Sequence, residues 1–169
     1  MRTVSDSELR AGLEAALGVR RWVAEVAGLA PFRDLDELLE AARTAATPLS
    51  ASEVDEALAH HPRIGEKPSG TGAAAAHSVR EQASPDADES ELAAALAASN
   101  AAYEARFGRV FLIRAAGRTR AEILAELDRR LALDEAVELR IIGEQLSEIA
   151  ALRLVATFGE KPTERTDAA

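Results

Sequence analysis

The sequence predicts an all-α protein: a single-domain bundle of about seven to eight helices, with a long loop laid across it. Composition is the first reason. Of the 169 residues, 47% are hydrophobic but only 4% are aromatic, and alanine supplies much of the apolar content. Alanine is the best helix former because it loses no side-chain entropy on ordering, and the β-branched and aromatic residues that favour strands are sparse. The second reason is that apolar residues recur at helical spacing along most of the chain.

The first third of the chain predicts four helices. Serine and aspartate side chains accept hydrogen bonds from the free amide groups at a helix start, so they mark where helices begin. Proline disfavours a helical backbone in the residue before it, so Pro31 and Pro62 end the second and fourth helices. We expect the first helix after Ser5 or Asp6, the second over Arg20–Leu29, the third after Asp34, and the fourth from Ser50 or Ser52 to His60.

Residues 61–77 predict a long loop. The segment opens with His61-Pro62-Arg63-Ile64-Gly65-Glu66-Lys67 and continues through Pro68-Ser69-Gly70-Thr71-Gly72, which are mostly residue types that form turns. Long ordered loops in compact domains more often serve function than structure. We therefore expect this loop to carry functional side chains.

The second half of the chain predicts helices separated by short breaks. The run Val110–Ile113, after Gly108, is the one strand-like segment in the sequence. No internal repeat and no second domain is visible, so we expect a helical domain over residues 1–160 and a polar, flexible tail over 161–169. The expected helices are Ser78–Ala83, Glu89–Phe107, Thr119–Leu131 and Asp134–Phe158.

Charge and residue usage exclude several classes of function. The net charge is -9, and an acidic surface repels phosphate backbones, so we expect no nucleic-acid partner. The chain has no cysteine, which removes disulfides, thiol nucleophiles and thiolate metal sites. No apolar run approaches the roughly 20 residues that span a bilayer, and the amphipathic, acid-bearing segment 1–17 does not resemble a signal peptide. We expect a cytoplasmic protein that does not bind membranes.

Three histidines are the only side chains whose free pKa lies near neutrality, about 6.5. His61 differs from His60 and His77 because it stands where a helix end meets a rigid proline turn, so its side chain has little freedom. The alternative is that His60 and His61 only interact with the carbonyl end of the helix. Glu81 and Gln82 form a second candidate pair, although Ser78, three residues before Glu81, also fits a structural capping box.

A third candidate group follows the long helix expected over 89–107. An extended segment in a helical protein leaves amide and carbonyl groups without ladder partners, so Val110–Ile113 could bond a small heterocycle rich in amides. Arg153 stands among apolar neighbours on the last expected helix. Such an arginine either reaches out to water or binds an anion.

Seven short pieces of the chain, in this order, form a pattern: Trp22-Val23-Ala24, Pro31-Phe32, His61-Pro62, Ser78-x-x-Glu81-Gln82, Asn100-x-x-Tyr103-x-x-Arg106-Phe107-Gly108, Phe111-Leu112-Ile113 and Leu152-Arg153-Leu154. Taken together and in order, they resemble one family, the 2-oxo-4-hydroxy-4-carboxy-5-ureidoimidazoline (OHCU) decarboxylases of urate degradation. No single piece is specific, but the ordered set is, and it runs from about Leu9 to Leu154. Where many members follow His-Pro with Asp-Leu-Ala-Gly, this chain has Arg63-Ile64-Gly65-Glu66, which looks like a bacterial variant.

The resemblance implies a carboxy-lyase that converts OHCU to S-allantoin without a cofactor or metal, often as a homodimer. By position, His61 resembles the family's proton donor and Glu81 its essential carboxylate, so these two are the expected catalytic residues. Side chains of Ser78, Gln82 and Arg153 resemble substrate-binding groups, and Pro62 resembles a main-chain contact. The full expected substrate-binding set is Pro62, Ser78, Val79, Arg80, Glu81, Gln82, Phe111, Leu112, Ile113 and Arg153.

Two other functions compete with this interpretation. A non-enzymatic helical interaction module explains the alanine-rich helices and the acidic surface, but it gives no reason for the His61 loop beside Ser78 and Glu81. A metal-dependent hydrolase would use His60, His61 and Glu81. Adjacent histidines on a helix point in different directions, which disfavours a shared metal.

Overall fold

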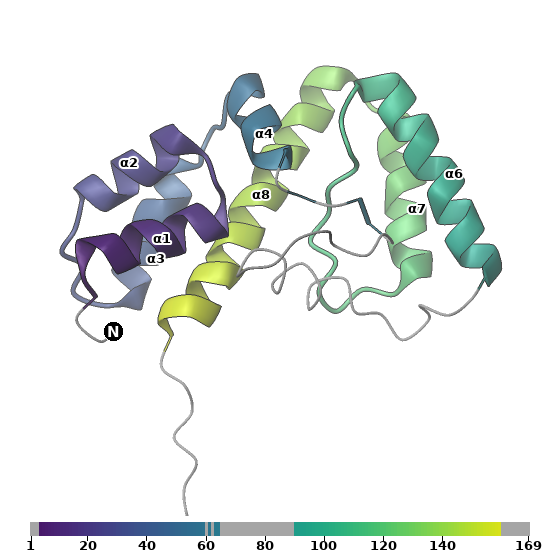
Figure 1. Ribbon diagram of the computed structural model, residues 1–169. Coiled ribbons are helices and arrows are strands. Elements are labelled where there is room, and N and C mark those ends of the chain that lie inside the picture. The colour runs from purple at the N-terminus through teal and green to yellow at the C-terminus, as the bar shows by residue number, and fades with distance from the viewer. Residues whose placement is uncertain (1–3, 60, 62, 65–89, 160–169) are drawn as a thin grey trace, which may run out of the picture.

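A computed structural model describes residues 4–59, 61, 63–64 and 90–159. Within these ranges it contains seven helices and no strand, which confirms the all-α class (Figure 1). The helix expected over Ser78–Ala83, most of the loop, and the tail at 161–169 lie outside the described residues. The helices are α1 (Asp6–Ala16), α2 (Arg20–Gly28), α3 (Leu35–Ala45), α4 (Ala51–Leu58), α6 (Ser90–Phe107), α7 (Arg120–Leu131) and α8 (Glu135–Phe158).

Three of the first four helices begin at the type of capping residue that the sequence indicated. The hydroxyls of Ser5 and Ser50 accept hydrogen bonds from the third amide of α1 and α4, and Glu8 and Glu53 bond back to complete capping boxes. The Asp34 side chain caps α3 by accepting a hydrogen bond from the amide of Glu37. Of the alternatives the sequence left open, Ser5 rather than Asp6, and Ser50 rather than Ser52, is the cap. Each cap satisfies an amide that would otherwise lack a partner.

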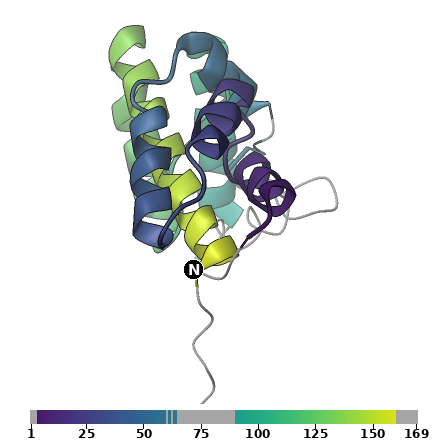
Figure 2. The same cartoon turned by 90° about the vertical axis from the view of Figure 1, so that its left-hand side faces the viewer.

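Helix α8 is the axis of the molecule. Helices α1, α3 and α4 pack against it, and α2 packs on α1 and α3. Figure 1 shows α1–α3 on one side of α8 and the α6–α7 pair on the other, and Figure 2 looks directly onto the α1–α3 side. The first of two hydrophobic clusters lies on this side and contains Trp22, whose indole Nε1 donates to the carbonyl of Ala42 at 2.8 Å. Burying the ring with its N–H bonded avoids the cost of an unpaired donor.

The second cluster joins α6, α7 and the connection between them. Tyr103 and Phe107 from α6 pack with Phe111 and Ile113 of the connection and with Leu127 of α7. The connection begins at Gly108, whose φ of 67° places it in the left-handed region that suits glycine after a helix end. Figure 1 shows the connection running between α8 and the α6–α7 pair.

The strand-like interpretation of Val110–Ile113 is wrong. The segment is apolar, and Phe111, Leu112 and Ile113 are buried, but it belongs to no strand. The described residues offer no neighbouring strand for it to pair with, and within the segment the carbonyl of Leu112 bonds to the side chain of Arg130 instead.

In the described part of the chain, no helix combines the length and the apolar character that a bilayer span requires.

Candidate active site

His61 follows the C-terminal end of α4, and that helix end orients its ring. Its backbone amide donates to the carbonyl of Leu58 at 3.0 Å, and its ring Nδ1 lies 2.9 Å from the carbonyl oxygen of Ala57. A carbonyl can only accept, so Nδ1 carries the proton in this contact. In the neutral ring, Nε2 is then the atom that accepts a proton, and it is buried. The structural alternative for His61, an interaction with the carbonyl end of the helix, therefore holds for Nδ1.

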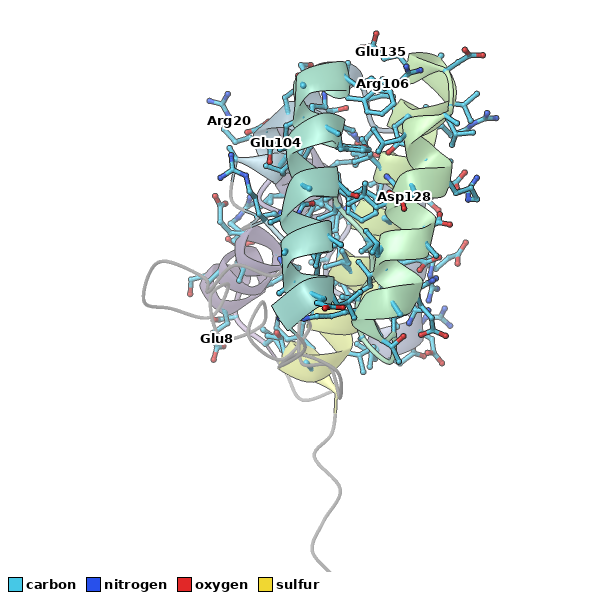
Figure 3. All side chains as sticks on the ribbon, turned by 90° about the vertical axis from the view of Figure 1, so that its right-hand side faces the viewer. Glu8, Arg20, Glu104, Arg106, Asp128 and Glu135 are labelled. Carbon is cyan, nitrogen blue, oxygen red and sulfur yellow. The ribbon has the colours of Figure 1, made fainter. Side chains whose placement is uncertain are left out.

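Side chains of helix α6 bind Arg63 and Ile64, the next two described residues along the loop. The guanidinium of Arg63 makes two hydrogen bonds to the carboxylate of Glu104, one of them at 2.8 Å, and this contact holds the pKa of Glu104 below its usual range. The amide Nδ2 of Asn100 donates to the carbonyl of Ile64 at 3.1 Å. Figure 3 shows Glu104 on the edge of α6 that is turned away from α7. Because Asn100 is buried, its bond defines where the backbone after His61 runs.

Two side chains hold the backbone at Phe111–Ile113 and at the next residue. Arg130 of α7 donates from Nη1 to the carbonyl of Leu112 at 2.8 Å, and Gln145 of α8 accepts from the backbone amide of Arg114 at 2.8 Å. The other main-chain groups of Leu112 and Ile113 form no hydrogen bond to any described residue. Buried amides and carbonyls need partners, so these groups are suited to bonding an amide-rich ligand.

A buried cluster anchors Arg130, and sequence reasoning missed it. Its Nε lies 2.9 and 3.0 Å from the two carboxylate oxygens of Glu138, and both side chains are 1% exposed. Glu138 also accepts the hydroxyl hydrogen of Tyr103, and burial, together with this contact, raises the pKa of Tyr103 above its usual range. The spacing held a signal: Arg130 follows Leu127 by three residues, and Glu138 precedes Ile142 by four, which places both charges on apolar helix faces.

Arg153 is buried, with only 4% of its surface exposed. Its Nη1 donates to the carbonyl of Ala16 at 3.3 Å, at the C-terminal end of α1. Of the two alternatives for this side chain, extension to water is therefore wrong. Helix α8 places a planar, charged group of donors inside the protein, the arrangement that suits carboxylate or carbonyl recognition.

The structure brings part of the predicted site together. Ile64, next to the His61 turn, packs in one cluster with Phe111 and Ile113. Leu112 packs in the other cluster with Ala57, the residue that bonds His61, and with Leu154, the neighbour of Arg153. Residues next to His61, in the connection and on α8 therefore belong to the same hydrophobic clusters. The remaining expected site residues, Pro62, Ser78, Val79, Arg80, Glu81 and Gln82, lie outside the described residues, as do His60 and His77.

Within the described ranges, no three histidine, aspartate or glutamate side chains are grouped as a metal ion would need. Two members of the alternative metal set, His60 and Glu81, lie outside those ranges.

The sequence matches that of a known protein family: a family model described as OHCU decarboxylase matches residues 2–155. The OHCU decarboxylase of Haloferax volcanii is 32% identical over 143 residues, which is 83% of each chain. The uric acid degradation bifunctional protein TTL of Arabidopsis thaliana is 38% identical over 109 residues, and the match covers only 34% of that longer protein.

Solved structures agree with the sequence relatives. A crystal structure of OHCU decarboxylase in the presence of (S)-allantoin has a TM-score of 0.75 and 25% identity, with 93% of this chain and all of that chain covered. An (S)-allantoin synthase structure, at 20% identity and a TM-score of 0.59, shares the fold over 92% of this chain and 51% of that one. Since the family model spans nearly the whole sequence and the helical fold agrees, this chain belongs to the OHCU decarboxylase family.

Proposed function

We propose that the protein catalyses cofactor-independent decarboxylation of OHCU to (S)-allantoin in urate degradation. One structural observation carries the proposal: the buried backbone at Phe111–Ile113 forms no strand, and the side chains of Phe111 and Ile113 belong to the same hydrophobic cluster as Ile64, three residues after the oriented histidine His61. The first suits recognition of a ring rich in amide groups, and the second suits management of a proton. Membership in the family supplies the substrate class.

The substrate's own chemistry explains why no external electron sink is needed. OHCU is a small anionic ring with a carboxylate, a hydroxyl and a ureido arm. When the bond to the carboxylate breaks, carbon dioxide leaves and the electron pair forms a double bond to the neighbouring ring carbon, which bears the ureido arm. The electron pair of that carbon's double bond to nitrogen moves onto the nitrogen, which takes a proton. The hydroxyl then loses its proton and becomes a carbonyl, while the carbon that bears the ureido arm takes a proton on one face, which gives one enantiomer of allantoin. The protein's task is to bind, orient and protonate.

His61 is the proposed acid–base group. With Nδ1 bonded to the carbonyl of Ala57, the ring cannot rotate freely, and proton exchange falls to Nε2. In this proposal, Nε2 takes the proton of the substrate hydroxyl and delivers a proton to the ring carbon. A positioned group of this kind contributes about 10²–10⁴-fold to rate.

The other groups of the proposed site bind and orient the substrate. The guanidinium of Arg153 would bind a carboxylate or carbonyl oxygen, and the main chain at Phe111–Ile113 would pair amide edges of the substrate. Glu81 would accept hydrogen bonds from ring or ureido N–H groups, with Pro62, Ser78, Val79, Arg80 and Gln82 completing the site. Because the whole chain carries a net charge of -9, capture of an anion depends on such local positive charge.

We also propose that the protein is a homodimer and acts in the cytoplasm. Leu152 and Val155, three residues apart on α8, are each 44% exposed, and apolar side chains at helical spacing favour association with a second copy. The lack of cysteine fits a reducing compartment. Light scattering coupled to size exclusion would give the mass in solution, and a monomer at micromolar concentration would contradict the dimer.

The experiment that tests the proposed function is circular dichroism of freshly generated OHCU mixed with the purified protein. We expect rapid appearance of optically active allantoin with the wild type, and much slower appearance with His61→Ala or Glu81→Ala. The exposed Arg10→Ala variant is the control, because among the described residues the Arg10 side chain forms its ion pair with Asp6, on the surface of α1. If the wild type is no faster than the spontaneous, racemic decay, the enzymatic proposal fails and the helical interaction module becomes the function to pursue.

A further inference from the structure

Two side chains hold the peptide groups on both sides of Ile113. The carbonyl of Leu112, which precedes it, accepts from Arg130, and the amide of Arg114, which follows it, donates to Gln145. Both bonds are 2.8 Å long, and they come from different helices, α7 and α8. Each bond fixes one peptide plane.

The planarity of the peptide bond then determines in which direction the amide and the carbonyl of Ile113 point. In a trans peptide, the C=O and the N–H point in opposite directions. The amide of Ile113 therefore points away from Arg130, and the carbonyl of Ile113 points away from Gln145. Neither group forms a hydrogen bond to any described residue, although Ile113 is only 5% exposed.

We infer that Arg130 and Gln145 are positioning residues, which turn the amide and carbonyl of Ile113 toward the ring of the substrate. In an extended chain, these two groups of one residue lie on the same edge, as in an antiparallel ladder. A donor and an acceptor side by side match a ring or ureido amide, which has the complementary pair. This inference rests on the proposed function and adds to it the residues that prepare the main-chain contact.

The contacts of Arg130 favour a role in positioning the backbone over a role limited to neutralising the charge of Glu138. Its guanidinium is fixed by Glu138 and stacks 4.7 Å from the centre of the Phe111 ring, so the donor aimed at Leu112 has little freedom. A buried ion pair is weak support for stability, because desolvation offsets most of its attraction. Gln145 makes no ion pair at all, yet its bond to the same backbone has the same length.

Gln145 offers the cleaner test, because it is only partly buried. Gln145→Leu removes the acceptor for the Arg114 amide, whereas Gln145→Glu keeps an oxygen in that place. The matched control is Glu148→Leu, one turn further along α8, which removes a 3.0 Å bond to the Arg114 side chain but none to the backbone. We measure KM and kcat for OHCU, the dissociation constant of (S)-allantoin by calorimetry, and the melting temperature.

The expected result is a rise of about tenfold in KM and in the (S)-allantoin dissociation constant for Gln145→Leu, the factor that loss of one oriented hydrogen bond produces. Gln145→Glu should restore both to within about threefold, and Glu148→Leu should leave both unchanged. Equal constants for Gln145→Leu and Glu148→Leu, or a loss that follows melting temperature alone, would overturn the inference.

Arg130 needs a variant that still folds, since its removal alone would leave Glu138 buried and unpaired. The triple change Tyr103→Phe, Arg130→Met and Glu138→Leu replaces the whole cluster by apolar groups, which proteins often tolerate. We expect a folded protein whose (S)-allantoin affinity falls about tenfold, and unaltered affinity in that folded variant would count against Arg130. If the wild-type protein neither converts OHCU nor binds (S)-allantoin, the proposed function has failed. If the wild type does both and only the variants lose affinity, the result concerns the positioning residues alone.

Discussion

The imidazole of His61 and the carbonyl oxygen of Ala57, at the end of α4, lie in hydrogen-bonding contact, with 2.9 Å between Nδ1 and the oxygen. The contact distinguishes the two ring nitrogens. Nδ1 is bound to the end of α4, and in the proposed mechanism Nε2 exchanges the proton with the substrate. Asparagine at position 61 would separate the structural role from the proton transfer. Its side-chain amide can donate to the carbonyl of Ala57 but cannot take up a proton at neutral pH.

We therefore expect His61→Asn to lower kcat by about 10²–10⁴-fold while the melting temperature stays within a few degrees of wild type. Initial rates of formation of optically active allantoin and a thermal melt of the same preparation measure the two quantities. His61→Gln, which carries its amide further from the backbone, is the companion variant and should be equally inactive. Retention of more than a tenth of wild-type kcat in His61→Asn would remove His61 from the acid–base role.

Arg153 gives a prediction about binding rather than proton transfer. Lysine keeps the charge but has no planar fork, so Arg153→Lys should raise KM for OHCU about tenfold and change kcat less. Steady-state kinetics separate the two constants. The control is Arg10→Lys on the exposed face of α1. Unchanged KM in Arg153→Lys would contradict a role in binding the substrate.

Glu53 gives a prediction about pH and stability. The hydrogen bond from Arg21, followed by that from the Ser50 backbone, lowers the pKa of Glu53 to about 2. A carboxylate whose pKa is lower in the folded than in the unfolded state adds stability above the unfolded value, about 4.3, and loses it as pH falls toward 2. Gln at this position keeps the capping geometry but not the charge.

Glu53→Gln should therefore be less stable than wild type by about 1 kcal/mol at pH 7, a modest figure because Arg21 is 42% exposed and water screens the pair. The difference should shrink between about pH 4.5 and pH 2. Urea unfolding at several pH values measures it. A difference that stays constant down to pH 2 would show that the charge on Glu53 does not stabilise the fold.

Two glycines give opposite predictions from the same substitution. On Gly12 of α1, a Cβ would clash with the Cζ atom of the buried Phe158 ring, so Gly12→Ala should destabilise the protein by about 1–3 kcal/mol. On Gly28, at the end of α2, a Cβ meets nothing within 4 Å, and Gly28→Ala should stabilise by about 0.4–1 kcal/mol. Urea unfolding of both variants gives the free energies. Similar values for the pair would mean that α1 and α8 do not pack as closely as described.

The sequence by itself determined what depends on local chemistry. Alanine content and apolar spacing gave the helices, and the caps at Ser5, Asp34 and Ser50 were readable because a cap is a bond to an amide three residues away. Gly108 likewise marked the end of α6. The ordered motifs around His61, Tyr103 and Arg153 were sufficient to indicate the family.

The tertiary structure decided what depends on residues distant in the chain. Val110–Ile113 resembles a strand in composition, but a strand needs a partner strand; here Arg130 bonds the carbonyl of Leu112, and Gln145 bonds the amide of the next residue, Arg114. The direction in which the Arg153 side chain points followed only from packing α8 on α1. The pairing of Arg130 with Glu138 was equally hidden, because charged residues are mostly exposed and a buried pair is stable only when the fold brings its members into contact.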